Sequence, residues 1–197
     1  MLDILSKIDL FVIGTSAGGI DLLNKILPSF KRTFHYKVAL VIHMPPEGPN
    51  LIPSLYKDSC LLDISEAIPG EEIKADHIYV SPVDYHLCVE PDETFSLSSE
   101  EPVNFSRPSI DLLFESAAYA YGKKVAGILL SGANEDGARG LKMIQDAGGV
   151  TIVQNPSDAE YEFMPESALK IMKPDLILSS DEIASLISNL CRERTQR

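Results

Sequence analysis

Short apolar runs alternate along this chain with stretches in which apolar residues recur at helical spacing. The runs predict buried strands over residues 10–13, 38–42, 125–130, 150–154 and 175–178. The periodic stretches predict helices over residues 20–27, 50–56, 109–121, 137–147, 166–172 and 182–191. Strands buried on both faces and separated by helices are typical of a doubly wound α/β fold, in which helices cover both faces of a mostly parallel sheet.

The middle of the chain has a different pattern. Apolar and polar residues alternate over 73–80, 86–90 and 94–97, and Ser81-Pro82 and Pro91-Asp92 supply turn signals between these segments. Such alternation is typical of antiparallel hairpins with one solvated face. We therefore expect an antiparallel hairpin region at the edge of the parallel sheet, all within a single domain spanning residues 1–197.

Composition and charge narrow the class of protein. Of the 197 residues, 45% are apolar and 23% are charged, which is enough apolar surface for a folded core. The formal net charge is −12, whereas a surface that binds nucleic acid or an anionic membrane needs a basic field. No apolar run approaches the roughly 20 residues that span a bilayer. We expect neither a nucleic-acid partner nor direct insertion into a membrane.

Most of the negative charge lies in one segment. Residues 66–101 hold ten acidic side chains and one basic side chain, Lys74, so the rest of the chain is nearly balanced. We call residues 66–101 the acidic segment and expect substrate to dock away from it. Local cations would then provide recognition, with Arg107, Arg139 and the basic tail over residues 192–197 as candidates.

The cysteines and histidines do not indicate a metal or disulfide scaffold. The three cysteines lie far apart and are odd in number, which favours a reducing compartment and therefore the cytoplasm. His77, His86 and Cys88 have none of the spacings that ligate zinc. The sequence predicts no metal and no cofactor.

A glycine-rich turn follows the first predicted strand and opens the first predicted helix, with the sequence GTSAGG at residues 14–19. A dinucleotide fingerprint would need glycine where Ser16 stands, and a P-loop would need lysine where Ile20 stands. The turn does match GxSxG, the nucleophile elbow that exposes a serine hydroxyl beside a helix N-terminus. Ser16 is therefore a candidate nucleophile, and the alternative is that it only caps the helix.

Two further residues follow predicted strands and suit the same chemistry. His43 comes directly after the strand over 38–42, and Asp136 follows the strand over 125–130. The carboxyl ends of parallel strands meet at one edge of a sheet, which places both residues near Ser16. In a Ser-His-Asp triad His43 is the base and Asp136 orients its ring. Glu135 is the rival carboxylate, and helix capping is the alternative role for Asp136.

Six segments, taken in order, resemble the catalytic domain of the chemotaxis-receptor protein-glutamate methylesterases of the CheB type. The resemblance extends over about residues 9–190. The segments are IGTSAGG (13–19), VIHMPP (41–46), DHIYVSPVDYHL (76–87), FSRPSIDLLFESAA (105–118), GILLSGANEDGARGL (127–141) and GGVTIVQNPSDAEYEFMPESAL (148–169).

The resemblance implies an activity and assigns roles to particular residues. Members hydrolyse the methyl ester of glutamyl side chains on the cytoplasmic helical bundle of chemoreceptors, and many also deamidate glutamine there. Ser16 matches the family's nucleophile, His43 its base and Asp136 its triad acid. The backbone N–H groups of His43 and Ala133 match the positions that form the oxyanion hole. Arg107 is a candidate substrate contact, with a salt bridge that holds its loop as the alternative.

Some features depart from the family pattern. Ala133 stands where methionine is usual, and Asn134 replaces a glycine, which would strain the loop if that position needs a positive φ. The resemblance covers no phospho-receiver domain, so we expect a free-standing enzyme or an excised piece of a longer chain, with a separate regulatory protein as an open partner. Two other functions stay open, namely a hydrolase of another ester or amide and a signalling module without catalysis.

Overall fold

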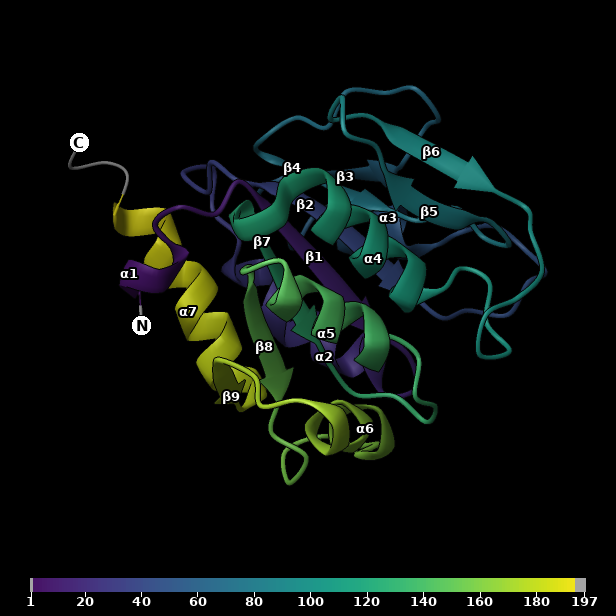
Figure 1. The fold of residues 1–197 in the computed structure, drawn as a ribbon. Helices are drawn as coiled ribbons and strands as arrows, with labels where there is room; N and C mark the ends of the chain where they lie inside the picture. The colour runs from purple at the N-terminus through teal and green to yellow at the C-terminus, as the bar shows by residue number, and fades with distance from the viewer. Residues whose placement is uncertain (1, 194–197) are drawn as a thin grey trace.

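The structure is a computed structural model that describes residues 2–193, which are built around one seven-stranded sheet (Figure 1). Every neighbouring pair of its strands is parallel. In sheet order the strands are β3 (Asp63–Glu66), β4 (His77–Val80), β2 (Lys37–Ile42), β1 (Leu10–Thr15), β7 (Val125–Leu129), β8 (Val150–Gln154) and β9 (Leu176–Leu178). A separate antiparallel sheet consists of β5 (His86–Val89) and β6 (Phe95–Ser98).

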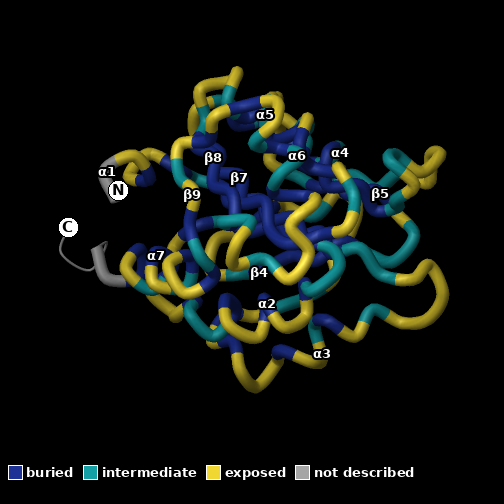
Figure 2. Tube along the Cα trace, turned by 90° about the horizontal axis from the view of Figure 1, so that it is seen from below, coloured by how far each residue is buried: buried dark blue, intermediate teal, exposed yellow. Residues whose placement is uncertain are grey.

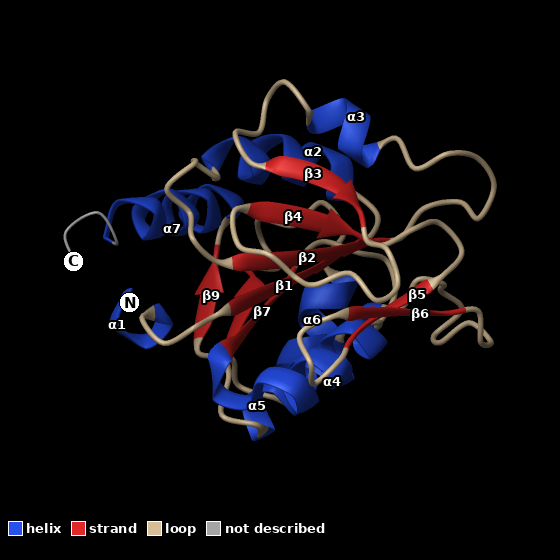
Figure 3. Ribbon diagram, turned by 90° about the horizontal axis from the view of Figure 1, so that it is seen from above, coloured by secondary structure: helices blue, strands red, loops and turns tan. Residues whose placement is uncertain are grey.

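Helices cover both faces of the seven-stranded sheet, as a view along the sheet shows (Figure 3). One face carries α2 (Gly19–Ile26), α3 (Ile52–Tyr56) and α7 (Ser180–Glu193), and the other carries α4 (Ile110–Tyr121), α5 (Ala138–Asp146) and α6 (Phe163–Ile171). The short elements are α1 (Leu2–Leu5) and the 3₁₀ turns η1 (Leu27–Ser29) and η2 (Gly122–Lys124). The doubly wound prediction is confirmed. Among residues 2–193, no helix has the length and apolar character to cross a bilayer.

The central strands are buried, as Figure 2 shows for β7 and β8. Strand β1 beside β7 is buried on both faces too, which is why its first four residues are a continuous apolar run. Successive side chains of a strand point to opposite faces of the sheet. Phe11 and Ile13 accordingly lie in the core beneath α2 and α7, while Leu10 and Val12 lie in the core beneath α4 and α5.

The order of the strands reverses at β1, which pairs with β2 on one side and with β7 on the other. At such a switch point the loops after the two flanking strands separate and leave a crevice at the carboxyl edge of the sheet. The loops after β1, β2 and β7 carry Ser16, His43 and Asp136. The prediction that these three residues share one edge is confirmed.

The prediction that residues 73–80 form a strand of the antiparallel hairpin region is wrong. Only His77–Val80 forms a strand, β4, and it runs parallel to β2 and to β3, an edge strand that the pattern did not reveal. Ile78, Tyr79 and Val80 are all buried, as expected for a strand inside a sheet. The polar residues before them belong to a turn in which Asp76 has a φ of 64°, so the apparent alternation joined a turn to a buried strand.

The prediction that 86–90 and 94–97 form an antiparallel hairpin is confirmed, but the predicted position of this hairpin at the edge of the main sheet is wrong. β5 and β6 pair with each other in a separate sheet. Leu87, Val89 and Phe95 are buried in the same core as the inner face of α4, and the Val89 N–H donates to Ser116 Oγ at 3.0 Å. The apolar face of the hairpin therefore packs on a helix, and the two edge strands of the main sheet are β3 and β9.

A buried carboxylate at the N-terminus of each of α4 and α5 accepts hydrogen bonds from backbone N–H groups of the other helix. Asp136, which precedes α5, accepts hydrogen bonds from the N–H groups of Ile110 (2.6 Å) and Asp111 (3.2 Å) at the start of α4. Asp111 in turn accepts from the N–H of Gly140 in α5 (2.7 Å). A Cβ at Gly140 would lie 2.7 Å from the Asp111 carbonyl oxygen, so this close approach requires glycine. Because N–H groups at helix starts lack intrahelical acceptors, each carboxylate stabilises the opposite helix.

Replacing Asp111 by asparagine tests the burial of this carboxyl group through the pH dependence of stability. Burial raises the pKa of Asp111 from 3.8 to about 6, so the folded state holds a proton more tightly than the unfolded state does. The contribution of Asp111 to stability is then greatest below about pH 4 and is lost as pH rises toward 6. Relative to the Asp111→Asn variant, the wild-type free energy of unfolding is expected to fall by about 2–3 kcal/mol between about pH 4 and about pH 7. Urea unfolding of both proteins measures this, and parallel pH curves would contradict it.

Candidate active site

Ser16 lies at the turn between β1 and α2, and the glycines after it allow the turn to be tight. Gly18 has a φ of 75° and is the N-cap of α2, which has no side-chain cap. A Cβ at Gly19 would lie 2.8 Å from the Thr15 side chain. The hydroxyl of Ser16 therefore does not cap the helix, and it points instead toward His43.

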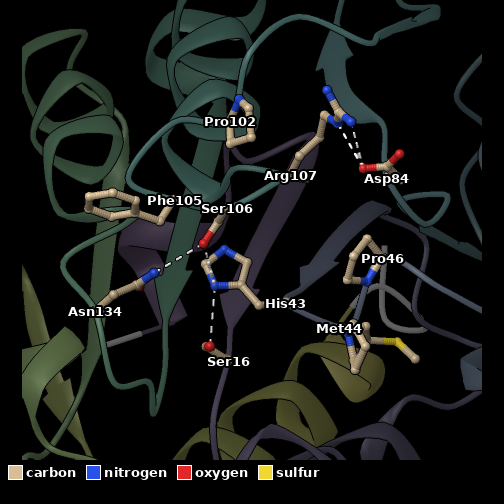
Figure 4. Close-up of a pocket in the computed structure, with 11 residues that line it drawn as sticks. Ser16, His43, Met44, Pro46, Asp84, Pro102, Phe105, Ser106, Arg107 and Asn134 are labelled. Atoms are coloured by element: carbon tan, nitrogen blue, oxygen red, sulfur yellow. Dashed lines mark hydrogen bonds and ion pairs between the residues drawn. The ribbon is translucent and has the colours of Figure 1, made fainter.

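Ser16, His43 and Asp136 form a continuous hydrogen-bonded chain. Ser16 Oγ lies 3.2 Å from His43 Nδ1 (Figure 4), and Asp136 Oδ2 lies 2.9 Å from His43 Nε2. A carboxylate on Nε2 favours the tautomer that carries its proton there, which leaves Nδ1 free to accept the serine O–H. This arrangement is suited to proton transfer from Ser16 to His43.

Asp136 is fully buried, yet it is held in its ionised form. Burial by itself raises the pKa of a carboxyl, but the hydrogen bond and charge of His43, with the N–H groups of Ile110 and Asp111, lower the pKa of Asp136 below its ordinary value. Ser109 Oγ donates a further hydrogen bond at 2.9 Å. The carboxylate is thus charged at neutral pH and fixes the orientation of the imidazole.

The rival carboxylate, Glu135, lies elsewhere. Its side chain is exposed and lines a separate hollow of about 240 Å³ with Asn104, Arg139 and Ile171. Asp136 also does not cap α5, because Gly137 is the N-cap and no side chain caps that helix. Of the two adjacent acids, it is Asp136 that contacts His43.

Two hollows meet at Ser16 and His43. The larger, of about 640 Å³, is the one in Figure 4, and a second of about 440 Å³ lies over the N-terminus of α2 and includes Tyr161. The larger cavity is lined by Ser16, His43, Met44, Pro45, Pro46, Asp84, Pro102, Phe105, Ser106, Arg107 and Asn134. Ser16 and His43 are therefore accessible from two sides.

Arg107 belongs to the wall of the larger cavity, where it is bound by other residues of the protein. Its guanidinium forms an ion pair with Asp84 at 2.8 Å and donates to the carbonyl oxygens of Ser99 and Glu100 at 3.0 Å each. The loop-holding salt bridge is therefore present, and the guanidinium also faces the cavity. Because Asp84 lines the same cavity, the acidic segment is not remote from the site, contrary to expectation.

The other cations proposed for recognition lie away from this cavity or outside the described residues. Arg139 is exposed and its guanidinium is 3.9 Å from Glu115 on α4. The side chains of the basic tail over 192–197 lie outside the described residues. Among the proposed cations whose side chains the structure describes, Arg107 is therefore the one that reaches the cavity.

A loop over residues 101–109, which periodicity did not reveal as part of the site, borders His43. Ser106 Oγ lies 3.3 Å from His43 Nδ1 and accepts a hydrogen bond from Asn134 Nδ2 at 3.1 Å. Both ends of this loop are fixed by His86, which is fully buried. Its Nδ1 accepts from the Ser109 N–H, and its Nε2 donates to the Glu101 carbonyl oxygen at 3.2 Å. Alternation alone gave no signal for this role of His86.

Of the two backbone N–H groups expected to form the oxyanion hole, one is already hydrogen-bonded within the protein and the other is not. The His43 N–H donates to the Thr15 carbonyl oxygen at 3.1 Å, as an extension of the sheet, so this group is not free for an oxyanion. Within residues 2–193, the N–H groups of Ala133 and Ala17 donate to no protein acceptor. Ala17 is the residue after Ser16, the position that supplies an oxyanion donor in nucleophile elbows.

Known proteins resemble this chain in sequence and in fold. The model of the CheB methylesterase family matches residues 11–187. A Leptospira interrogans protein, provisionally named protein-glutamate methylesterase/protein-glutamine glutaminase, is 45% identical over 91% of this chain and 93% of its own length. A Clostridium acetobutylicum protein with that name, without the provisional label, is 31% identical over 94% of this chain and 54% of its own length.

Among solved structures, the Thermotoga maritima CheB methylesterase catalytic domain superposes with a TM-score of 0.87 at 28% sequence identity. The match covers 93% of this chain and 98% of that domain. The seven-stranded parallel sheet with its separate hairpin is thus the architecture of that catalytic domain. The family match extends over nearly all of the described residues, and the chain belongs to the CheB methylesterase family.

Proposed function

We propose that this protein is a serine hydrolase that removes the methyl ester from glutamyl side chains of chemoreceptors and releases methanol. The observation that supports this most directly is the hydrogen-bonded chain from Ser16 through His43 to the buried Asp136, at the junction of two hollows. Membership of the CheB methylesterase family and the names of its relatives supply the substrate class.

The reaction proceeds in two stages. His43 Nδ1 takes the proton of Ser16 as Oγ attacks the ester carbonyl carbon, and Asp136 stabilises the imidazolium that forms. The proton then passes from His43 to the departing methoxy oxygen, so that methanol leaves and an acyl-enzyme ester on Ser16 remains. Water, deprotonated by His43, attacks this ester, and His43 returns that proton to Ser16 Oγ as the acyl bond breaks. The glutamyl carboxylic acid that leaves loses its remaining proton to solvent and becomes the carboxylate.

The negative charge on the carbonyl oxygen during each attack needs N–H donors. We assign this role to the backbone N–H groups of Ala133 and Ala17, both of which lack a protein acceptor. Ala133 was expected from the family resemblance, and its change from methionine leaves the N–H in place. The N–H group of Ala17 takes the role that was expected of the His43 N–H, because the latter donates to a carbonyl oxygen within the sheet.

The same steps accommodate deamidation. With a glutaminyl side chain as substrate, the leaving group is ammonia in place of methanol and the product is again a glutamyl carboxylate. The names of the relatives combine these two activities. We place both activities on the helical bundle of receptors in the cytoplasm and treat residues 1–197 as one catalytic unit. Arg107, which faces the cavity, is the proposed contact for substrate.

Removal of the nucleophile provides the first test. Ser16→Ala is expected to lower the rate of methanol release from a methylated receptor fragment by at least about 10³-fold, because the acyl-enzyme cannot form. Release of radiolabelled methanol measures this rate, and labelling by a fluorophosphonate reports the reactive hydroxyl directly. Ser54→Ala, at an exposed serine of α3, is the matched control. A Ser16→Ala protein with the wild-type rate would exclude this mechanism, and a folded wild type that resists labelling would favour a non-catalytic module.

The two adjacent acids supply a matched pair for the second test. Asp136→Asn presents an amide to His43 Nε2, favours the wrong tautomer and is expected to lower kcat by about 10⁴-fold. Glu135→Gln removes a negative charge from the exposed side chain of the neighbouring residue. Its kcat is expected to stay within about twofold of the wild-type value. Receptor demethylation is measured for both, with circular dichroism to verify folding. Equal losses in the two variants would contradict the assignment of Asp136.

A further inference from the structure

The loop beside His43 contains a tight turn with an unusual backbone. The Val103 N–H donates to the Ser106 carbonyl oxygen at 3.1 Å, and the Ser106 N–H donates to the Val103 carbonyl oxygen at 2.8 Å. The two residues between them, Asn104 and Phe105, have φ values of 49° and 63°. Positive φ at both central residues is the mark of a type I′ turn, for which Asn-Gly is the preferred pair.

Asn104 fits this turn, but Phe105 occupies the position that glycine prefers. A bulky side chain at positive φ is a genuine outlier, because its Cβ crowds the following carbonyl. The ring gains nothing from burial in return, since Phe105 is 103% exposed. Two unfavourable features therefore coincide at one residue. Strained backbone of this kind is retained mainly at functional sites.

The turn is held firmly on both sides of Phe105. Asn104 Nδ2 donates to Asp111 Oδ2 at 3.0 Å and to Asp136 Oδ1 at 3.2 Å. On the other side, Ser106 Oγ lies within hydrogen-bonding distance of His43 and Asn134. Asn104 thus contacts Asp136 and Ser106 contacts His43, so the backbone of Phe105 between them is held at a fixed place beside the site.

The ring of Phe105 lines the larger cavity on the side of Asn134, across His43 from Met44 and Pro46 (Figure 4). Met44, Pro46 and Pro102 line the same cavity. An ester on a short glutamyl side chain has to enter this cavity to reach Ser16, which brings the backbone of the substrate close to the rim. If that backbone is helical, the residues three and four positions from the glutamate lie on the same face and approach the rim with it.

We propose that Phe105 is a specificity-determining contact that packs against an apolar side chain one helical turn from the esterified glutamate of the substrate helix. This inference rests on the proposed function. Burial of an exposed aromatic ring against a partner is a favourable contribution that is absent in the free enzyme. A small ester does not extend to the rim, so Phe105 discriminates a helical protein substrate from a small ester.

The experiment compares kcat/KM for a methylated receptor fragment with kcat/KM for a small aryl ester. In Phe105→Gly the ratio of the two is expected to fall by about tenfold or more, mainly through KM for the receptor fragment. The melting temperature is expected to stay the same or rise, because glycine suits the positive φ. Phe105→Tyr keeps the ring and is expected to retain the wild-type ratio. Tyr119→Ala, at an exposed aromatic residue of α4, is the control for loss of a surface ring.

The outcomes separate this inference from the proposed function. A wild type that demethylates the fragment, with the same ratio in Phe105→Gly, overturns the role of Phe105 and leaves the function intact. A wild type that cleaves only the aryl ester overturns both. A lower melting temperature in Phe105→Gly would contradict the strain argument, and Phe105→Asn, which also tolerates positive φ, then tests the ring separately. A change in oligomeric state instead of the ratio would assign the ring to self-association and overturn the proposal.

Discussion

The ionised carboxylate of Asp136 is the constraint on which the rest of the site depends. A fully buried charge is costly unless donors surround it, and here the donors come from three separate parts of the chain. They are the ring of His43 after β2, the side chain of Asn104 in the 101–109 loop, and the N-terminal residues 109–111 of α4. Satisfying this one carboxylate therefore fixes the loop after β7, the start of α4 and the imidazole of His43 relative to one another.

The position of α4 follows from the same constraint. Its first N–H groups need acceptors, and Asp136 supplies them, while Asp111 supplies an acceptor to Gly140 of α5. The two helices approach closely enough for this because residue 140 has no side chain. Packing, helix capping and the orientation of His43 are consequently parts of one arrangement, and a change that moves α4 also moves the triad.

The parts of this arrangement that depend on periodicity could be predicted from the sequence. Continuous apolar runs indicated the central strands, and residues placed directly after those strands indicated Ser16 and His43, because the geometry of a parallel sheet brings strand ends together. What depends on tight turns could not be predicted. The choice between Glu135 and Asp136 depends on where the loop after β7 turns. The His43 N–H is hydrogen-bonded because the pairing of β1 with β2 continues one residue beyond the end of β2. The parallel pairing of β4 was hidden because the turn at Asp76 continued the apparent alternation into the strand.

One departure of this chain from the expected family pattern, Asn134, forms hydrogen bonds within the site. Asn134 replaces a glycine, yet it is not among the described residues with positive φ, so the replacement causes no strain. Its side chain instead donates to Ser106 Oγ and accepts from the Asp136 N–H. Ser106 in turn contacts His43. A glycine at position 134 would leave the 104–106 turn with one anchor fewer. Asn134 therefore belongs to the network that holds His43 and Asp136 in place, which favours an active enzyme over a signalling module without catalysis.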